Sequence, residues 1–578
     1  MLRPVVSPTR TEKGSQPVPT EIIADIDRLQ TRVAIMRDGR LLELKYETEE
    51  DVVGNIYLGK VTDVIPGLDA AFVNCGIERN VFLHVSDALL EEPPRGPRRG
   101  QNLPRIQDVV KAGEEFLVQV TKGPLELKGA RATRRLSLPG RYMVLTTGGG
   151  KVGVSKKIED EAERKRLRDL AAKVRDPAFG VIVRTRAEDA TQEQLEADVR
   201  FLVKVWRAIE NRARGAKAPA LIHEDVGLVF EMVRDVFSAD VDHFVLSTKV
   251  AYDQVLNLLN NTAPHLRDRV ELYRGHQPIF EHYGVEKEID RALQLKVGLP
   301  HGGGLVVDTT EALTTVDVNS GKFTGAGSLE QTVLTTNLEA CEEVARQLRL
   351  RDIGGIIVID FIDMDKPAHR KQVMTALRKA FANDRMRTRI MHLTRLGLVE
   401  MTRKRTGESL RDRMQVRCPC CGQGRILAPE TVAHRTRNEM RVQSPKHAGQ
   451  AIHVLLDPLS ALAAVGPHGS EGEALEQELG VPVYVRATHA IHPESYYVTF
   501  GDPAQFEKEY QRHKVGQILE IAPDQAVVSA EPGFLLALVD GCLLEVPELS
   551  VKLDKPIKVR LTRADHSYLR GTPASQKR

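Results

Sequence analysis

The sequence has little that would mark a membrane protein, a secreted protein or a chain cross-linked by disulfides. No apolar run approaches the length that spans a bilayer, and the opening residues MLRPVVSPTRTEKGSQPVPT lack the apolar core of a signal peptide. Six cysteines, three of them within CPCC, do not form a disulfide framework. These absences predict a cytoplasmic protein without a membrane span.

Aromatic residues and net charge are scarce as well. Aromatics make up 5% of the 578 residues, with a single tryptophan, so base stacking would depend on a few placed side chains. The net charge of +3 does not by itself indicate a nucleic-acid partner. Cations do cluster in RATRRLSLPGR and MTRKR, as phosphate contacts require, although such runs are more often solvated helix faces. The length predicts several domains.

Residues 305–365 carry the clearest chemical pattern. LVVDTTEALTTVDVNSGKFTG is typical of paired strands, and Asp317 and Asn319 would leave the same strand face because they are two residues apart. An amphipathic helix follows, and IIVIDFIDM is typical of a buried strand that carries Asp360 and, just after it, Asp363. A strand–helix–strand unit of this length favours a parallel pair, so Asp317 and Asp360 can converge on one cation.

Two carboxylates and an amide oxygen are a hard, oxygen-only ligand set that suits Mg²⁺, an ion that stabilises charge on a phosphodiester and generates hydroxide from water. The same aspartates fit turn caps or partners of the many arginines, and spacing alone does not separate the two hypotheses. Further along, Arg395, Arg403 and Lys404 are candidates to clamp a scissile phosphate, or else belong to a solvated helix face.

The N-terminal region predicts a small antiparallel barrel. Short strands punctuated by glycine and proline run from GNIYLGKVTDVIPGLDAAFVNC to EEFLVQVTKGPLELKG, with a proline- and arginine-rich loop over 91–108 between them. On an oligonucleotide-binding barrel, Phe72 and Phe82 would stack on bases, and Lys122 and Lys128 would contact phosphates. The alternative, favoured by base rate, is that both phenylalanines belong to the barrel core.

Two shorter motifs also carry chemistry. VIVRT predicts a strand ending at a helix start, where Arg184 and Thr185 would bind a terminal phosphate or else pair with a nearby carboxylate. VRCPCCGQGRI places Cys418 and Cys421 in a C-x-x-C arrangement that can share one Zn²⁺. A closed zinc site needs four ligands and no second C-x-x-C exists in the chain, so another subunit would supply the other pair. A redox dithiol is the alternative.

TTVDVNSGKFTG and TNLEACEEVARQLRLRDIGGIIVIDFIDM closely resemble the catalytic region of the ribonuclease E/G family, bacterial endoribonucleases that cut single-stranded RNA. The resemblance extends, with gaps, over residues 30–425. It implies that Asp317 and Asp360 hold a catalytic Mg²⁺ and that Asn319 supports the site. No long proline-rich or arginine-rich tail is present, which favours the shorter, ribonuclease-G-like type.

The resemblance also implies roles outside the catalytic region. Phe72, Phe82 and Lys128 would meet RNA, and the CPxC motif would link protomers through a shared Zn²⁺ into a homodimer or homotetramer. The residues implied to form a pocket for a 5′-monophosphate are Arg184, Thr185, Gly140 and Val144.

The sequence departs from better-known members of the family at three places. Arg186-Ala187-Glu188-Asp189 replaces small residues after the pocket motif, Lys156-Lys157 replaces two arginines, and Cys420 is an additional cysteine. A lysine offers a point charge rather than a bidentate fork, so the strength of end discrimination stays open. So does the role of Cys420.

The expected fold is multidomain α/β plus β. An oligonucleotide-binding (OB-fold) barrel is inserted in a ribonuclease-H-like domain and followed by an α/β, DNase-I-like catalytic subdomain, a zinc link and small C-terminal α+β and β domains. The expected boundaries are a disordered tail (1–20), the first segment of the ribonuclease-H-like domain (21–50), the barrel (51–136), the 5′-phosphate sensor region (137–220), the second segment of the ribonuclease-H-like domain (221–294), the catalytic subdomain (295–414), the zinc link (415–427), a small dimerisation-type domain (428–512) and a second small β-barrel with a tail (513–578).

The functional prediction is a Mg²⁺-dependent endoribonuclease that cleaves single-stranded RNA, such as ribosomal RNA precursors and messenger RNA. It would leave 5′-phosphate and 3′-hydroxyl ends and respond to a 5′-monophosphate. The alternatives are a non-catalytic RNA-binding protein, which would keep the barrel without the metal, and a nuclease that cleaves DNA.

Overall fold

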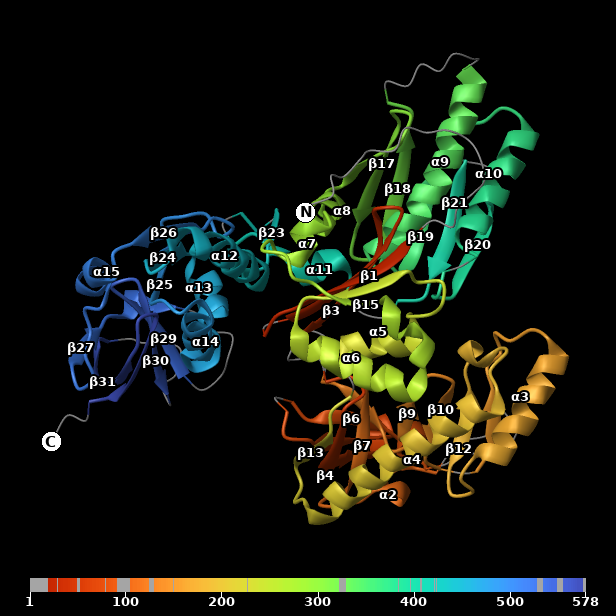
Figure 1. The fold of residues 1–578 in the computed structure, drawn as a ribbon, viewed down its shortest axis with the longest axis horizontal. Coiled ribbons are helices and arrows are strands. Elements are labelled where there is room, and N and C mark those ends of the chain that lie inside the picture. Colours follow the sequence, from red (N-terminus) through yellow and green to blue (C-terminus); the bar gives the residue numbers. More distant parts are fainter. Residues whose placement is uncertain are drawn as a thin grey trace. The chain divides into compact units, whose positions relative to one another are not determined.

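The computed structural model describes residues 19–28, 30–48, 52–77, 79–90, 104–123, 129–148, 150–225, 227–321, 329–382, 384–394, 397–405, 408–419, 421–422, 424–527, 534–547 and 555–574. The chain forms two compact units, Met1–Arg274 and Gly275–Arg578 (Figure 1). Within the residues described, no helix combines the length and the apolar character that crossing a membrane requires.

The first unit contains a five-stranded sheet built from distant segments of the chain. Its order is β15-β14-β1-β2-β3, and β1 pairs in parallel with β14, Ile22 lying beside Phe244. Apolar residues of α5 and α6 cover one face, where Met232 and Leu259 pack with Ile22 and Phe244. The bounds are β1 Thr20–Ile26, β2 Gln30–Arg37, β3 Arg40–Thr48, β14 His243–Leu246, β15 Val270–Leu272, α5 Leu228–Asp235, α6 Lys249–Thr262 and the 3₁₀ segment η3 Pro264–Arg269.

A closed barrel of five strands lies within the same unit. The strands run in the order β4-β5-β6-β8-β7, and β4 also pairs with β7, which closes the ring. Val73, Leu83 and Val118 fill its interior. A further strand, β13, extends the sheet from β4. The bounds are β4 Ile56–Ile65, β5 Ala70–Asn74, β6 Val81–His84, β7 Glu115–Lys122, β8 Arg131–Thr133, β13 Ala220–His223, η1 Pro66–Leu68, α1 Val85–Ala88 and α2 Ile106–Val109.

A four-stranded sheet in the order β11-β12-β10-β9 completes the first unit. Two helices pack on it, α4 starting with a capping box formed by Thr191 and Gln194. Leu145, Val181 and Leu202 lie in the shared core. The bounds are β9 Ser137–Pro139, β10 Met143–Thr146, β11 Val152–Val154, β12 Gly180–Val183, η2 Thr185–Ala187, α3 Glu161–Val174 and α4 Gln192–Gly215.

The second unit begins with a six-stranded sheet in the order β16-β17-β18-β19-β21-β20. Helix α9 connects β18 to β19, which pair in parallel, so the predicted strand–helix–strand unit is confirmed. Both α9 and α10 cover one face, because Val316, Ile357 and Leu348 share a single core with α10 (Figure 1). The bounds are α7 Ile279–His282, α8 Val285–Leu293, β16 Lys296–Gly298, β17 Gly304–Thr309, β18 Leu313–Asn319, α9 Leu329–Leu350, β19 Gly355–Asp360, α10 Pro367–Ala380, β20 Thr388–Leu393 and β21 Leu398–Arg403.

The C-terminal region of this unit combines a three-stranded sheet, β25-β24-β26, with a six-stranded sheet, β27-β31-β32-β30-β29-β28. One core joins them, because Val454 of β24 packs in the same cluster as Leu543 and Tyr568. The second barrel expected over 513–578 stays a prediction, since 528–533 and 548–554 lie outside the described residues.

The elements of this C-terminal region are α11 Leu410–Met414, β22 Gln415–Arg417, β23 Arg425–Leu427, α12 Pro429–Gln443, η4 Ser444–His447, β24 Ala451–Leu456, α13 Pro458–Val465, η5 Pro467–Gly469, α14 Ser470–Leu479, β25 Val483–Ala487, β26 Tyr497–Gly501, α15 Pro503–Tyr510, β27 Ile518–Ile521, η6 Pro523–Gln525, β28 Ala526–Val527, β29 Phe534–Val539, β30 Cys542–Pro547, β31 Ile557–Ala564 and β32 Tyr568–Pro573.

Candidate active site and nucleic-acid interface

Asp317 and Asp360 lie side by side at the carboxyl ends of two parallel strands. They are register partners in the β18–β19 ladder, and adjacent strands lie about 4.8 Å apart. Strand alternation turns Val316 and Ile359 into the core, while both aspartates are exposed on the face opposite α9 and α10. The fold therefore brings together two carboxylates that are 43 residues apart in the numbered sequence.

Asn319 lies on the same exposed strand face and orients the first carboxylate. Its Nδ2 donates a hydrogen bond to Oδ2 of Asp317 at 2.7 Å. Within the described residues, neither Asp317 nor Asp360 forms an ion pair with a lysine or arginine. The hypothesis that these aspartates serve as partners of arginines therefore finds no support in this structure.

The two carboxylates repel each other. Partial burial raises the pKa of Asp360 above its ordinary value, and the charges of Asp317 and Asp363 raise it further. Asp363 follows the strand and packs close to Gly397, where an added Cβ would lie 3.3 Å from its Oδ1. A bound cation would offset this accumulated negative charge.

The donor set fits a hard divalent cation that keeps most of its waters. Mg²⁺ is usually held by one or two protein carboxylates together with water and substrate oxygens. Among the residues that the structure describes, no group of three or more His, Cys, Asp or Glu side chains has an arrangement that could hold a metal ion. Among the described residues, the oxygen ligands that the two strand ends present here are the carboxylates of Asp317 and Asp360, with the Asn319 amide bonded to Asp317.

The prediction that Arg403 helps to clamp the scissile phosphate is wrong. Its guanidinium is buried, donates to the Ile353 carbonyl at 2.9 Å and pairs with Asp384 at 2.9 Å. Arg403 pairs with Gly355, at the opposite end of β19 from Asp360, about 16 Å along the strand. Lys404 follows it at that far end, and Arg395 lies outside the described residues.

Phe72 and Phe82 form an aromatic pair on the outside of the barrel. They are register partners on β5 and β6, with ring centroids 5.9 Å apart in an edge-to-face arrangement. Both are half-buried, whereas their neighbours Val73 and Leu83 are fully buried in the interior. The hypothesis that they belong to the barrel core is therefore not supported.

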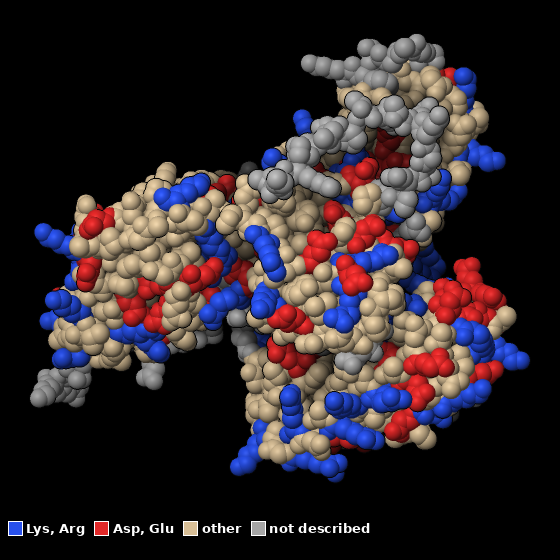
Figure 2. All heavy atoms as spheres, in the orientation of Figure 1, with Lys and Arg blue, Asp and Glu red and all other residues tan. Residues whose placement is uncertain are grey.

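Of the two cations expected near this aromatic pair, the structure describes one. Lys122 is exposed at the end of β7, paired with Arg131, and Arg131 is also the register partner of Phe82. Lys128 lies outside the described residues. Figure 2 shows lysine and arginine side chains intermixed with acidic ones on the face that it draws, so charge does not outline an interface on that face.

Arg184 lies at the end of β12 and reaches two partners. One terminal nitrogen donates to the Gly140 carbonyl at 2.6 Å, and the other pairs with Asp235 at 2.6 Å. The Thr185 hydroxyl lies 3.0 Å from that of Ser155. Val144 is on β10, which pairs directly with β12. The structure thus brings the four predicted pocket residues into one neighbourhood, in which Arg184 is already paired with the Asp235 carboxylate.

Sequence reasoning missed the acids that shape this pocket. Burial alone would raise the pKa of Asp235, but the guanidinium groups of Arg234 and Arg184 lower it below its ordinary value. Asp198 accepts the backbone N–H groups of Arg141, Tyr142 and Met143, and a Cβ on Gly140 would lie 2.5 Å from its carboxylate. No local signal identifies these partners, because they are distant in sequence.

Cys418 and Cys421 lie on a tight hairpin between β22 and β23. The Cys418 N–H donates to the Gly424 carbonyl at 2.7 Å, and the Gly424 N–H donates to Sγ of Cys421 at 3.3 Å. A Cβ on Gly424 would lie 3.6 Å from that sulfur and 4.0 Å from Cβ of Cys418. Sγ of Cys421 and Cβ of Cys418 thus both lie near Gly424, an arrangement compatible with two ligands of a shared metal. Cys420 lies outside the described residues.

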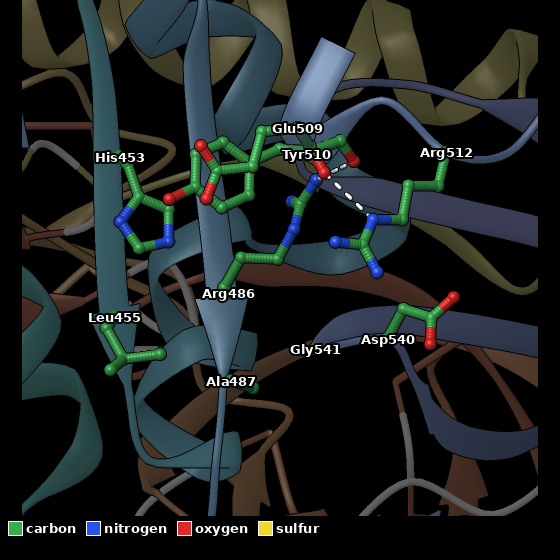
Figure 3. A pocket seen from close by; sticks show the side chains of 9 residues that line it. All are labelled: His453, Leu455, Arg486, Ala487, Glu509, Tyr510, Arg512, Asp540 and Gly541. Carbon is green, nitrogen blue, oxygen red and sulfur yellow. Dashed lines mark hydrogen bonds between the residues drawn. The ribbon is translucent and has the colours of Figure 1, made fainter. Parts of the chain in front are cut away.

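A separate hollow of about 290 Å³ lies in the C-terminal region (Figure 3). His453 stacks on Tyr510 with ring centroids 4.3 Å apart. Arg486 is buried, and its guanidinium donates to the carbonyls of Tyr510 and His566 at 2.6 and 2.7 Å. Because Arg486 bonds to backbone carbonyls of its own region, we interpret the hollow as a structural feature that does not belong to the candidate site.

Comparison with known proteins identifies the family. The family model for the Ribonuclease E/G family matches residues 137–406. Ribonuclease G of Salmonella typhimurium (strain SL1344) is 39% identical over 481 residues, covering 82% of this chain and 98% of that protein. Ribonuclease G of Escherichia coli (strain K12) is 38% identical over the same shares of both chains. Ribonuclease E of Nostoc sp. is 40% identical over 394 residues, covering 67% of this chain and 56% of that protein. The chain belongs to the ribonuclease E/G family.

Proposed function

We propose that this chain is a Mg²⁺-dependent endoribonuclease that hydrolyses single-stranded RNA to 5′-phosphate and 3′-hydroxyl ends. The observation that carries the proposal is the pair of adjacent, exposed carboxylates of Asp317 and Asp360 on one sheet face, with no lysine or arginine partner among the described residues. Membership of a family whose nucleases are in general metal-dependent supports the same conclusion. The enzyme acts in RNA processing and decay, on ribosomal RNA precursors and messenger RNA, in the cytoplasm.

Asp317 and Asp360 would hold Mg²⁺ through carboxylate oxygens, with Asn319 fixing the orientation of Asp317. When bound, the ion supplies an activated water and offsets the charge that develops on the phosphoryl group. The protein residues supply a fixed pair of ligands on a rigid ladder. Because a strand pair is stiffer than a loop, the ligands need little rearrangement when the substrate arrives.

RNA contacts outside the catalytic sheet set where the strand is held. Phe72 and Phe82 present ring surface on the barrel exterior, on which bases stack, and Lys122 and Lys128 contact the backbone. Arg184 and Thr185, with Gly140 and Val144, receive the 5′-monophosphate. The phosphate would compete with Asp235 for the guanidinium of Arg184, since both are anions and Asp235 is already 2.6 Å away.

Zinc would join protomers. Cys418 and Cys421 supply two thiolates, and the same two cysteines of a second copy complete the four ligands of a structural site. The expected assembly is a homodimer or a homotetramer. Dimers that dissociate on zinc chelation, in sedimentation velocity measurements, would support this arrangement, and dimers that persist without zinc would contradict it.

Cleavage of matched oligonucleotides tests the function. The full chain, in Mg²⁺, should cleave a single-stranded oligoribonucleotide and leave the deoxyribonucleotide of the same sequence intact. Asp317→Asn and Asp360→Asn should each abolish cleavage but not RNA binding. Asp308→Asn is a matched control, because Asp308 is an exposed acid on the neighbouring strand β17, opposite Thr315 rather than Asp317.

Three outcomes would overturn the proposal. Cleavage of the DNA strand at a similar rate would indicate a nuclease without ribose preference. RNA binding without cleavage by the wild-type chain would indicate a binding protein. Full activity of Asp317→Asn and Asp360→Asn would show that the carboxylate pair does not carry the reaction. Equal rates for 5′-phosphate and 5′-hydroxyl substrates would remove only the end-sensing role.

A further inference from the structure

A buried asparagine joins helix α9 to the segment that leaves strand β19. Asn337 is 0% exposed, and its amide makes two hydrogen bonds to one residue. Its Nδ2 donates to the carbonyl oxygen of Ile362 at 2.8 Å, and its Oδ1 accepts the N–H of Ile362 at 3.1 Å. One side chain therefore satisfies both backbone groups of Ile362.

Ile362 lies between the acids at this end of the sheet. Asp360 is the last residue of β19, and Asp363 immediately follows Ile362. Phe361 and Met364 are buried in the core beneath the sheet, 3% and 5% exposed. The backbone must therefore leave the strand with its apolar side chains inward and both carboxylates outward, and Asn337 holds it at the midpoint of that path.

Electrostatic repulsion works against this geometry. Asp317, Asp360 and Asp363 carry like charges at one strand end, and within the described residues none of them has a lysine or arginine partner. Repulsion favours conformations in which the segment after Asp360 swings away from Asp317. A backbone anchored at two points resists such displacement better than one anchored by apolar packing alone, because hydrogen bonds are directional.

Only a primary amide suits this position. An amide carries a donor and an acceptor on one planar group, whereas leucine has neither and a serine hydroxyl sits on a side chain too short to span both groups of Ile362. Asparagine is a poor choice inside a helix on propensity alone, so its presence here is better explained by these bonds than by helix formation.

We propose that Asn337 is a positioning residue of the divalent-metal site, holding the Asp360 carboxylate beside that of Asp317 in the arrangement that receives the cation. It acts through the backbone of Ile362 and touches neither substrate nor metal. This inference rests on the metal site of the proposed function, but the loss of metal affinity can be measured whether or not the chain cleaves RNA.

Titration of the RNA-free full chain with Mn²⁺, followed by electron paramagnetic resonance, tests this role. Asn337→Leu should weaken Mn²⁺ binding about 10- to 100-fold, the usual effect of removing a group that orients a metal ligand. Hydrogen exchange of the segment 355–366 should accelerate in the same variant. Thr336→Val is the matched control, because Thr336 is also buried on α9 but donates its hydroxyl to Thr332 within the same helix.

Cleavage kinetics add a second readout. The Mg²⁺ concentration for half-maximal cleavage should rise by a similar factor, and high Mg²⁺ should restore kcat, while the KM for RNA changes less than about twofold. A general packing defect would not be rescued by Mg²⁺. Should Asn337→Leu fail to fold, Asn337→Ser decides, since it leaves more room and keeps at most one of the two bonds.

Mn²⁺ binding that is unchanged in a folded Asn337 variant would overturn the inference, as would an equal loss in Thr336→Val. Failure of the proposed function looks different. A wild-type chain that binds Mn²⁺ tightly, loses this affinity on replacing Asn337, and yet cleaves no RNA would refute the nuclease while retaining the positioning role.

Discussion

Replacing Asp360 by asparagine should stabilise the protein while removing its activity. Asp360 and Asp317 are register partners on adjacent strands and both are exposed, so at about 5 Å in a water-like dielectric their repulsion amounts to about 0.8 kcal/mol. Burial and the neighbouring charges raise the pKa of Asp360. For an acid this means that the native state loses stability as pH rises through that pKa, and the loss is complete at neutral pH. An amide avoids it.

Differential scanning calorimetry at pH 7.5 with and without Mg²⁺ measures the effect. In a chelator, Asp360→Asn should melt about 1–2 °C above the wild type, as expected for a gain below 1 kcal/mol in a large domain. In Mg²⁺ the order should reverse, because a ligand at tenfold its dissociation constant stabilises the wild type by about 1.4 kcal/mol. Asp308→Asn should show neither change, because it removes only a surface ion pair with Arg411, with the charged atoms 3.7 Å apart, and such pairs contribute little to stability.

The result that would refute this reasoning is a lower melting temperature of Asp360→Asn in the chelator. Such a result would mean that the carboxylate makes a net favourable interaction in the metal-free protein and helps to hold the fold together. An unchanged Mg²⁺-induced shift in the variant would show that the ion binds elsewhere.

Other predictions concern the barrel, the pocket, the cysteines and pH. Replacing Phe72 or Phe82 by leucine should weaken oligoribonucleotide binding about 5- to 150-fold without a matching loss of melting temperature, because stacking contributes about 1–3 kcal/mol per base. Fluorescence anisotropy measures the affinity. Unchanged affinity would mean that both rings serve packing instead of RNA binding. Arg184→Lys should reduce the ratio of cleavage rates for 5′-phosphate and 5′-hydroxyl RNA about tenfold, since a lysine cannot form the forked contact. Cys421→Ser should lose bound zinc by elemental analysis and sediment as a smaller species. Burial and a neighbouring guanidinium lower the pKa of His453 to about 4. The full pKa difference corresponds to about 3 kcal/mol of stability lost as pH drops from about 6.5 to about 4. Solvent screening of this half-buried ring reduces the expected loss to about 1–2 kcal/mol, and His453→Gln should lose less over that range.

The carboxylate pair follows from the sequence because every step is local. Alternation places Asp317 and Asn319 on one strand face, and the amphipathic helix after them implies a parallel return strand. Parallel strands end at the same edge, so Asp360 can come near Asp317, and the β18–β19 pairing confirms that it does. A base rate alone favours a core position for Phe72 and Phe82. Strand alternation favours the outer face for Phe72, because its apolar neighbours along the strand point into the barrel.

What could not be predicted depends on partners far along the chain. Arg403 lies in a basic run typical of a solvated surface, yet it is buried against Asp384 and Asp352. Arg184 meets Asp235, which lies 51 positions further along the numbered sequence. Asn337 sits in an amphipathic helix where a polar residue is expected to face water. In each case tertiary packing, rather than local pattern, decides what the side chain contacts.

The parallel pairing of β1 with β14 has a consequence for how the first unit is made. Residues 20–26 emerge from the ribosome more than 200 residues before their partners at 243–246. The barrel strands lie between β1 and β14 in the sequence, so the barrel can fold during synthesis. Until β14 is made, the edge of β1 stays unpaired. Truncations that end before residue 243 should therefore leave β1 exposed to aggregation, and useful fragments of this half must extend through β15.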